Sequence, residues 1–268
     1  DPDGTLGATV PVGRERAGPG SLVLDAWGLD SRRLVLHSLG PVAEEWDGVR
    51  AYRDRRDAVI HLVDDEGREL GPSIRFPGGY SIAGAFGDLR APLANEPMVS
   101  VRGGRILHGS GLRYELVLRG DDVRPIRIIR WDGWRAPLSD TLQRRVRDSL
   151  ELVFEPARER RPELVSQLLD ALFDPELLPD TLPALRSAIL DDGGRIWVSA
   201  FRPTTDAWSQ EMSWHVLDSL GTPLARVLLP PRARLAAVRG SRVALVERDE
   251  VDVEHVRVFE LVGPGEVR

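Results

Sequence analysis

The sequence predicts an all-β protein, a β-propeller built from four-stranded antiparallel blades. The first reason is the stretch 185–229, in which four short runs rich in Val, Ile, Leu and Trp are separated by turns of Asp, Gly and Ser. Such runs are typical of consecutive antiparallel strands. The second reason is an internal repeat: Arg105, Arg195 and Arg242 each follow a Gly-containing turn and begin a second strand, and the last two are 47 residues apart. A four-stranded propeller blade needs about 40 to 50 residues.

The composition narrows the chemistry that is open to the chain. All 36 basic residues are Arg and there is no Cys, which excludes lysine Schiff bases, P-loop lysines, thiol nucleophiles and disulfides. The formal net charge of −6 argues against non-specific binding to nucleic acid, because such binding needs a basic surface. No apolar run reaches the about 18 residues that a transmembrane helix requires. We therefore expect no nucleic-acid partner and no transmembrane segment.

The N-terminal part of the chain is expected to contain several strands and a recurring hairpin turn. Strands are expected at 22–25, 34–37 and 58–63, with a return strand that reaches residue 79. An Asp-x-x-Gly turn follows at 64–67, recurs at 218–221, and is also present at Asp1-Pro2-Asp3-Gly4. Because Asp caps such a turn and Gly supplies a positive φ, the motif predicts hairpins.

The later units follow the same plan. The second unit is expected to open at 98–107 and to include a strand at 126–131, and the third is the stretch 185–229. The final unit offers three strands, at 235–238, 243–246 and 253–261. Since a strand from the opposite terminus can close a propeller ring, we expect residues 6–12 to complete this blade. The chain is thus predicted to be a single propeller domain, 1–268, of about four blades.

A helical insertion is predicted at 137–183, between two blades. Asp140 is expected to cap its first helix, with Gln143 at the capping-box position and an apolar face of Leu142, Val146, Leu150 and Val153. Pro162 suits the first turn of the second helix. The apolar stripe of that helix is Leu164, Leu168, Leu169, Leu172 and Phe173. We expect the pair to pack on the rim or a face of the propeller rather than to form a mobile lid.

Three segments carry a resemblance to a known family: Asp1-Pro2-Asp3-Gly4-Thr5-Leu6, the segment 178–198 and the segment 248–258. Through them, and over essentially its whole length, the chain resembles the C-terminal part of the six-bladed β-propeller proteins common in Gemmatimonadota-like bacteria. The resemblance implies six blades, further blades before Asp1, and an extracytoplasmic location, because members are often exported or lipid-anchored. The chain begins without Met or a recognisable signal peptide, so we expect a removed leader or an N-terminal truncation.

Histidine and acidic residues provide the candidates for metal binding. His61 and His215 occupy equivalent positions before the two Asp-x-x-Gly turns, and their spacing matches no metal motif, so a packing or surface role is favoured. The acidic residues of 249–254 alternate with apolar ones and could bind Ca²⁺, but a solvated strand with Arg248 and Arg257 as partners is favoured. We predict no resident cofactor or metal.

Candidate ligand contacts come from arginine and tryptophan. No Gly-x-Ser-x-Gly elbow is present, and no residue is assigned a catalytic role. Trp197 and Trp214 are expected in the core, whereas the loop 131–134 with Trp134, and the loop that carries Trp208, are candidates for exposed contacts. Propellers usually bind ligands at the central channel. Arg186 and Arg234 lie where inner strands are expected to begin, so they are predicted at its mouth.

Three hypotheses for function follow. The first is an extracytoplasmic propeller that binds a protein, peptide or glycan without catalysing a reaction. The second is a lactonase-like hydrolase or a lyase with a metal in the central channel, which requires carboxylate, amide or imidazole groups on the inner strands. The third is a scaffold without a small ligand. Because the chain has a single Asn, Asn95, and no repeated acidic residue on the expected inner strands, the first hypothesis is preferred.

Overall fold

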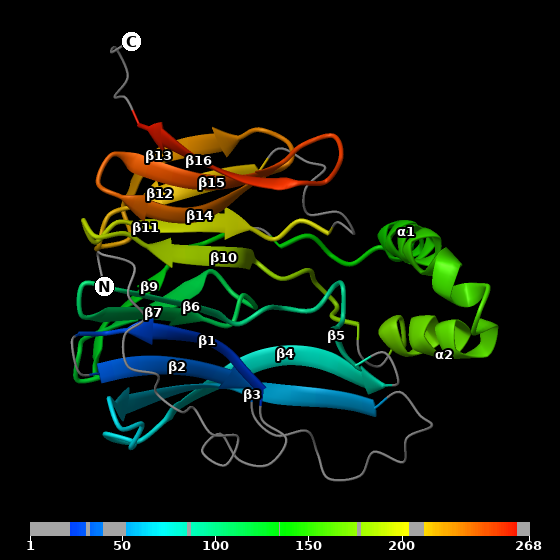
Figure 1. The fold of residues 1–268 in the computed structure, drawn as a ribbon, viewed down its shortest axis with the longest axis horizontal. Helices are drawn as coiled ribbons and strands as arrows, with labels where there is room; N and C mark the ends of the chain where they lie inside the picture. The colour runs from blue at the N-terminus through cyan, green and yellow to red at the C-terminus, as the bar shows by residue number, and fades with distance from the viewer. Residues whose placement is uncertain are drawn as a thin grey trace.

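The computed structural model describes residues 22–30, 33–39, 52–84, 87–133, 135–175, 178–203 and 212–261. These residues form four antiparallel sheets arranged as the blades of a β-propeller (Figure 1). Blade 1 contains β1 (Leu22–Gly28), β2 (Arg33–Leu39), β3 (Tyr52–Asp64), β4 (Ile74–Gly84) and β5 (Gly87–Arg90). Blade 2 contains β6 (Met98–Arg102), β7 (Arg105–Gly109), β8 (Glu115–Arg119) and β9 (Pro125–Arg130). Blade 3 contains β10 (Leu185–Leu190), β11 (Ile196–Ala200), β12 (Met212–Leu217) and β13 (Pro223–Leu229), and blade 4 contains β14 (Ala233–Arg239), β15 (Arg242–Arg248) and β16 (Glu254–Glu260).

The predicted fold class is confirmed by this arrangement. Arg105 and Arg242 begin β7 and β15, and Arg195 directly precedes β11, so the three arginines do mark the second strand of three blades. Blade 1 is longer than predicted, because β3 begins at Tyr52 and continues through a polar stretch with a bulge between Arg55 and Asp57. That stretch has no apolar alternation that could predict a strand. The expected hairpin at Asp1 and the closing strand at 6–12 lie outside the described residues.

The core lies between successive blades. One apolar cluster joins β2 and β3 to blade 2, a second joins blades 2 and 3, and a third joins blades 3 and 4. The first strands of the blades, β6, β10 and β14, lie next to one another, so they form the inner wall of the described arc. In Figure 1 the strands run horizontally, with blade 1 at the bottom and blade 4 near the top.

The two helices are α1 (Asp140–Arg158) and α2 (Pro162–Leu172), and they project beyond one end of the strands (Figure 1). The segments that lead to and from them pair where Leu138 N–H donates to Asp180 O at 3.0 Å and Leu182 N–H donates to Ala136 O at 2.9 Å. Their apolar faces cover a cluster that includes Leu93 and Leu182. The pair therefore packs on one face of the propeller, which we call the helix face.

Details of the helices differ from the prediction. The N-cap is Ser139, whose hydroxyl accepts a hydrogen bond from Leu142 N–H, so Gln143 is one residue too late for a capping box. Val153 is exposed, and Phe154, which continues the spacing of four residues, packs on the cluster instead. In α2 the buried face includes Val165, which replaces Leu164 of the predicted stripe. No helix of the described residues is long and apolar enough to cross a membrane.

The opposite face of the propeller carries the short hairpin turns, and we call it the hairpin face. The turns at 64–67 and 218–221 are built as predicted: Asp218 Oδ1 accepts hydrogen bonds from Leu220 N–H and Thr222 N–H, both at 2.8 Å, and Gly221 has a φ of 90°. In the first turn Asp64 accepts from Arg68 N–H at 2.7 Å, and Gly67 has a φ of 76°.

Candidate functional site

The four residues predicted to bind ligand fall into two groups. Arg186 and Arg234 are the second residues of β10 and β14, so both lie where inner strands begin, at the helix face. Arg186 is partly buried and Arg234 is exposed. Trp134 and Trp208 lie outside the described residues. Trp197 and Trp214 are 1% and 2% exposed in the cluster between blades 3 and 4, which confirms the prediction that they belong to the core.

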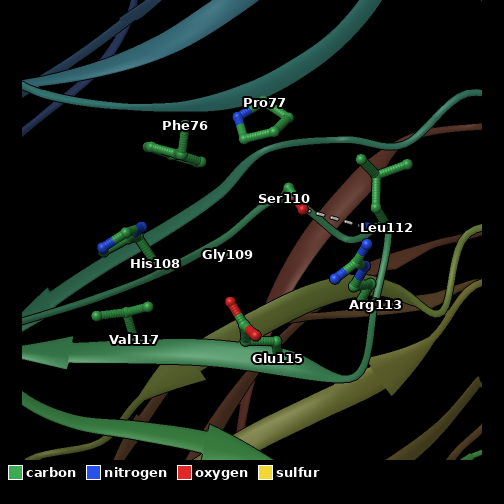
Figure 2. Close-up of a pocket in the computed structure, with 9 residues that line it drawn as sticks. All are labelled: Phe76, Pro77, His108, Gly109, Ser110, Leu112, Arg113, Glu115 and Val117. Carbon is green, nitrogen blue, oxygen red and sulfur yellow. Dashed lines mark hydrogen bonds between the residues drawn. The ribbon is translucent and has the colours of Figure 1, made fainter.

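Two neighbouring hollows lie beside the turn between β7 and β8, at the helix face. We call the first the arginine hollow; its volume is about 530 Å³, and it is lined by Arg113, Tyr114, Glu115, Arg130, Trp131, Asp132, Gly133 and Arg135. We call the second the blade hollow; its volume is about 310 Å³, and Figure 2 shows its lining residues between β4 and the β7–β8 hairpin. Arg113 and Glu115 line both hollows, so the two form one continuous candidate site.

The arginine hollow is lined by arginine side chains and by two aromatic rings, those of Tyr114 and Trp131. The rings of Tyr114 and Trp131 have centroids 5.6 Å apart and an interplanar angle of 50°, and both pack on the core between blades 2 and 3. A side chain at Gly133 would overlap the Tyr114 ring, so a glycine is needed for this approach. Arg130 is held by an ion pair of its Nε with Glu115 at 2.5 Å.

Arg113 is the exposed cation between the hollows. Arg135 Nη1 donates to Leu112 O at 2.9 Å, which fixes the turn that carries Arg113. Among the described residues Arg113 itself has no ion pair and no hydrogen bond from its guanidinium. An exposed guanidinium in a hollow retains its donors for a carboxylate or phosphate oxygen of a ligand.

The blade hollow is apolar on one side and polar on the other. Phe76, Pro77 and Val117 supply apolar surface, and Ser110 and Arg113 supply donors (Figure 2). His108 is 4% exposed at one end of the hollow, with its ring centroid 4.8 Å from that of Phe76.

The protonation state of His108 follows from its contacts. Arg119 Nε donates to His108 Nε2 at 2.9 Å, which places the proton of the neutral ring on Nδ1. Burial and the nearby Arg119 cation lower the pKa of His108 to about 4. Its Nδ1 has no hydrogen-bond partner within the described part of the chain, and the His108 ring is tilted by 48° to the neighbouring Phe76 ring.

The remaining histidines that the sequence singles out lie on strands. His61 on β3 approaches Glu69 Oε1 at 2.7 Å and the Ser38 hydroxyl at 3.2 Å, and His215 on β12 is exposed. These contacts connect His61 to β2 and to the segment that follows the turn at 64–67, which agrees with the favoured packing and surface roles.

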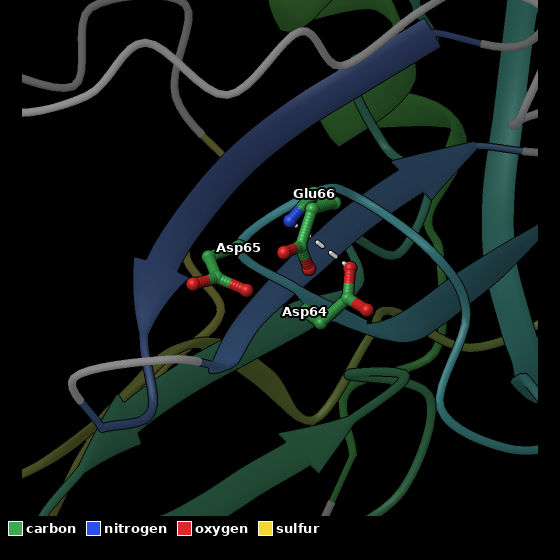
Figure 3. Close-up of side chains that lie close together, drawn as sticks. All are labelled: Asp64, Asp65 and Glu66. Carbon is green, nitrogen blue, oxygen red and sulfur yellow. Dashed lines mark hydrogen bonds between the residues drawn. The ribbon is translucent and has the colours of Figure 1, made fainter.

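Acidic side chains gather at two turns, and both sets already have partners. Asp64, Asp65 and Glu66 bring ligand atoms within 4.8 Å of one another (Figure 3). However, Arg68 pairs with Asp64 Oδ2 at 2.6 Å and with Glu66 Oε2 at 2.7 Å.

The acidic residues of the segment 249–254 also form ion pairs, each with a different basic residue. Asp252 pairs with Arg232 at 2.7 Å, Glu254 with Arg248 at 3.0 Å and Asp249 with His255 at 3.0 Å. Arg257 pairs with Glu247 at 3.1 Å.

Sequence reasoning missed Arg113, Tyr114 and the two hollows. The loop 131–134 was singled out for exposed contacts, and Trp131, Asp132 and Gly133 do line the arginine hollow. The turn 110–114 could not be connected to that loop, because their proximity depends on the pairing of β8 with β9. A cue was present in the sequence Gly111-Leu112-Arg113-Tyr114, where an arginine and an aromatic residue follow a turn glycine.

Comparisons with known proteins do not identify a family for this chain. No family model matches the sequence, and no curated protein matches it. A solved structure described as "Kluyveromyces lactis Hsv2 complete loop 6CD" aligns with 86% of this chain and 68% of its own chain, at 8% identity and a TM-score of 0.29. A likeness this weak carries no argument about this protein. The class of protein is therefore defined by its own architecture, a β-propeller.

Proposed function

We propose that this chain is a β-propeller binding protein without catalytic activity, and that it binds an acidic segment of a polypeptide at the two hollows beside the β7–β8 turn. The observation that carries the proposal is Arg113, an exposed guanidinium without an ion pair among the described residues, placed where both hollows meet. Arg130 and Arg135 line the same site. Charge-assisted hydrogen bonds from arginine to carboxylates are strong and directional.

The shape of the site favours a peptide over a glycan. Sugar rings bind on flat aromatic faces, whereas Tyr114 and Trp131 are tilted by 50° to each other and partly buried against the core. An extended acidic chain would contact Arg113 and place an apolar side chain in the blade hollow, against Phe76 and Val117. Arg186 and Arg234 start their strands at the same face, and we include them as further positive charge along the peptide.

The hydrolase or lyase alternative lacks a supporting observation. It requires metal ligands on the inner strands, and β6, β10 and β14 consist of aliphatic residues, Ser and Arg, with Met98 at the start of β6. None of these three strands carries a carboxylate, an amide or an imidazole side chain. The binding function therefore has the stronger support. Metal analysis of the purified protein tests the alternative, because a stoichiometric metal would favour a hydrolase or lyase.

The resemblance to the six-bladed propeller family supports two further parts of the proposal, the location of the protein and the number of its blades. We propose that the protein is bacterial, that it is secreted or lipid-anchored, and that its ring has six blades. Fractionation of the source cells with an antibody against this chain tests the location. Recovery from the cytoplasm alone would contradict it.

The experiment on the binding function uses a labelled synthetic peptide of repeating Glu-Glu-Tyr. We expect it to bind the protein in fluorescence anisotropy, and Arg113→Ala to weaken binding about tenfold, which corresponds to loss of one charge-assisted contact. The matched control is Arg127→Ala, because Arg127 is exposed on β9 of the same blade and lines neither hollow. Equal binding of a Lys-Lys-Tyr peptide, or an unchanged affinity in Arg113→Ala, would show that the proposal is wrong.

A further inference from the structure

The hairpin face carries the turns that join the first and second strands of three blades. We call these the inner turns, and they are 102–105 in blade 2, 191–195 in blade 3 and 239–242 in blade 4. Ile196 is in register with both Leu190 and Leu217. The inner turn of blade 3 therefore lies at the same end of the strands as the turn at 218–221.

The three inner turns adjoin one another. Gly240 N–H of blade 4 donates a hydrogen bond to Asp192 Oδ1 of blade 3 at 2.8 Å. On the other side, a β-carbon at Gly194 of blade 3 would lie 3.0 Å from Arg105 Nη1 of blade 2. The inner turn of blade 3 thus lies between the other two.

Arginines flank the inner turns of blades 2 and 4 in directly opposed pairs. Arg102 is in register with Arg105, and Arg239 is in register with Arg242. All four residues are exposed. Like charges directly opposite each other on neighbouring strands are destabilising. The two pairs therefore favour the presence of an anion.

The inner turn of blade 3 offers one exposed carboxylate to these arginines. Asp191 is buried and pairs with Arg195 of the same turn at 2.6 Å. Asp192 is exposed, and its Oδ2 lies 3.9 Å from Arg239 Nε. One long ion pair leaves most of the positive charge of the inner turns unneutralised.

The other carboxylates beside the inner turns already have partners. They are Asp121, which pairs with Arg33 at 3.1 Å, Asp122, which lies 3.6 Å from Arg124, and Glu260, which accepts from the Ser241 hydroxyl at 3.5 Å. Glu260 is also in register with Arg242, so it offsets part of that positive charge. Within the described part of the chain, Arg102 and Arg105 have no ion pair. The excess of positive charge is therefore greatest at blade 2.

Asp192 shows that a negative charge is stabilised between the opposed pairs. Its pKa is lowered by the hydrogen bond from Gly240 N–H and by the Arg239 and Arg102 cations. Arg102 belongs to blade 2 and Arg239 to blade 4, so the cations act on this position from both sides. No described atom lies within 4 Å of a β-carbon built at Gly103 or Gly240, which leaves room beside the carboxylate.

We propose that the inner turns of blades 2, 3 and 4 bind a small ligand with several phosphate charges, of which inorganic pyrophosphate is the simplest. Arg102 and Arg105 donate to its oxygens from blade 2, and Arg239 donates from blade 4. Arginine guanidinium groups match the oxygens of phosphate groups. The site is independent of the peptide site beside the β7–β8 turn, which lies at the opposite face.

The charges of the chain favour this class of ligand. Because the exposed cations outnumber Asp192 at the inner turns, the attraction grows with the negative charge of the ligand. A ligand with several phosphate charges is therefore favoured over a single carboxylate. A long nucleic acid is disfavoured, because the formal net charge of −6 leaves the rest of the surface unable to attract it.

Isothermal titration calorimetry with inorganic pyrophosphate at low ionic strength tests the site. We expect the intact chain to bind, and Arg102→Ala/Arg105→Ala to raise the dissociation constant at least tenfold, because two charge-assisted donors are lost. The matched control is Arg124→Ala/Arg127→Ala, which removes the same charge from exposed positions in the outer turn and on β9 of the same blade. Circular dichroism confirms that each variant is folded. Absence of binding to the intact chain, or equal losses in the two double variants, would overturn the proposal.

Asp192→Asn should change the affinity in the opposite direction. Asparagine keeps an oxygen acceptor for Gly240 N–H and removes the negative charge beside the ligand. We therefore expect pyrophosphate to bind about threefold more tightly. A loss of packing could not produce this gain, and weaker binding by Asp192→Asn would contradict the assigned position of the ligand.

Arg113→Ala separates this site from the peptide site. We expect the dissociation constant of pyrophosphate to stay unchanged in Arg113→Ala. Binding of the Glu-Glu-Tyr peptide should stay unchanged in Arg102→Ala/Arg105→Ala. Loss of pyrophosphate binding in Arg113→Ala would place this ligand at the helix face and overturn the proposal.

Discussion

Asp191 is a buried carboxylate that joins one turn to the core of blade 3. Its side chain accepts hydrogen bonds from Arg195 N–H at 2.8 Å, Arg195 Nε at 2.6 Å and Trp197 Nε1 at 3.2 Å. Arg195 Nη2 then donates to Gly240 O of blade 4 at 2.5 Å. One acidic residue thus orients a turn, a core tryptophan and a contact between blades.

We expect Asp191→Ala to lower the free energy of unfolding by about 2 to 4 kcal/mol, because the buried indole N–H and the partly buried guanidinium lose their acceptor. Urea denaturation monitored by tryptophan fluorescence measures the change. Asp65→Ala is the control, since Asp65 is exposed, and it should stay within about 0.5 kcal/mol of wild type. Equal effects of the two substitutions would contradict the role assigned to Asp191.

His108 makes the stability of the protein depend on pH. Its pKa is about 4 in the folded chain, chiefly because of burial, and 6.5 is the ordinary value. The unfolded chain therefore binds a proton more readily than the folded one between these values, and stability falls as the pH falls from about 6.5 to 4. The full loss is on the order of 3 kcal/mol.

The variant His108→Gln isolates this effect, because glutamine keeps an acceptor for Arg119 and does not titrate. We expect the decline in unfolding free energy between pH 6.5 and pH 5 to become shallower in this variant. Carboxylates with lowered pKa, such as Asp218, which accepts backbone hydrogen bonds from Thr222 and Leu220, lose their contribution at lower pH. His215→Gln, at an exposed position of β12, is the matched control substitution. An identical pH profile for His108→Gln would contradict this assignment.

Individual residues could be predicted where the sequence repeats. Trp197 and Trp214 were placed in the core because they lie on strands of the best-marked blade, and both are buried. Arg113 could not be found in this way, since its role depends on two hollows formed by a turn and a loop that are separated in the sequence. A residue that acts through long-range proximity leaves no local pattern.

At the scale of elements, alanine substitutions at the glycines of two hairpin turns distinguish the cost of backbone strain from the cost of a packing clash. Gly240 has a φ of 58° and nothing lies near the position of a β-carbon, whereas Gly221 has a φ of 90° and a β-carbon there would overlap Ile129 of blade 2. We expect Gly240→Ala to cost about 1 kcal/mol from the left-handed backbone alone. Gly221→Ala should cost more, because it also disturbs the contact between blades 2 and 3. Thermal unfolding of the two variants measures the difference, and equal costs would show that the turn does not support the neighbouring blade.

Strands were predicted better than element ends. Apolar runs between Asp and Gly turns identify strands because a strand buries its side chains and a turn needs special backbone angles. The polar start of β3 and the exact first residue of α1 carry no such signal. Ser139 and Asp140 are both good helix caps, and the choice between them depends on how the chain leaves the pairing with residues 180–182.

At the scale of the whole molecule, the blade repeat could be predicted and the way the blades cover one another could not. Equivalent arginines revealed three blades because each blade repeats its turn chemistry. The sequence does not show that Val256 and Val258 on β16 are exposed, since both belong to an ordinary apolar strand pattern. Burial depends on what lies on the other side of the sheet.

Removal of the two helices tests whether the propeller can fold without them. The segments around Pro137 and Thr181 form a β-bridge, so the chain leaves and re-enters the propeller at adjacent points. We expect that residues 139–179 can be replaced by Asn-Gly, a pair suited to a two-residue hairpin loop. The shortened chain should keep a β-sheet circular dichroism spectrum and a cooperative transition. Its melting temperature should be lower, because Leu93 and Leu182 lose the cover of α1 and α2.

A second shortened variant with Leu93→Thr separates loss of cover from loss of fold. Leu93 is fully buried beneath the helices, so its exposure favours aggregation, and the threonine should restore solubility without restoring the melting temperature of the intact chain. Loss of the sheet spectrum in both shortened variants would mean that the helices are required for the blades to fold. The measured difference between the two variants therefore decides whether the insertion covers a propeller that is already stable or completes its core.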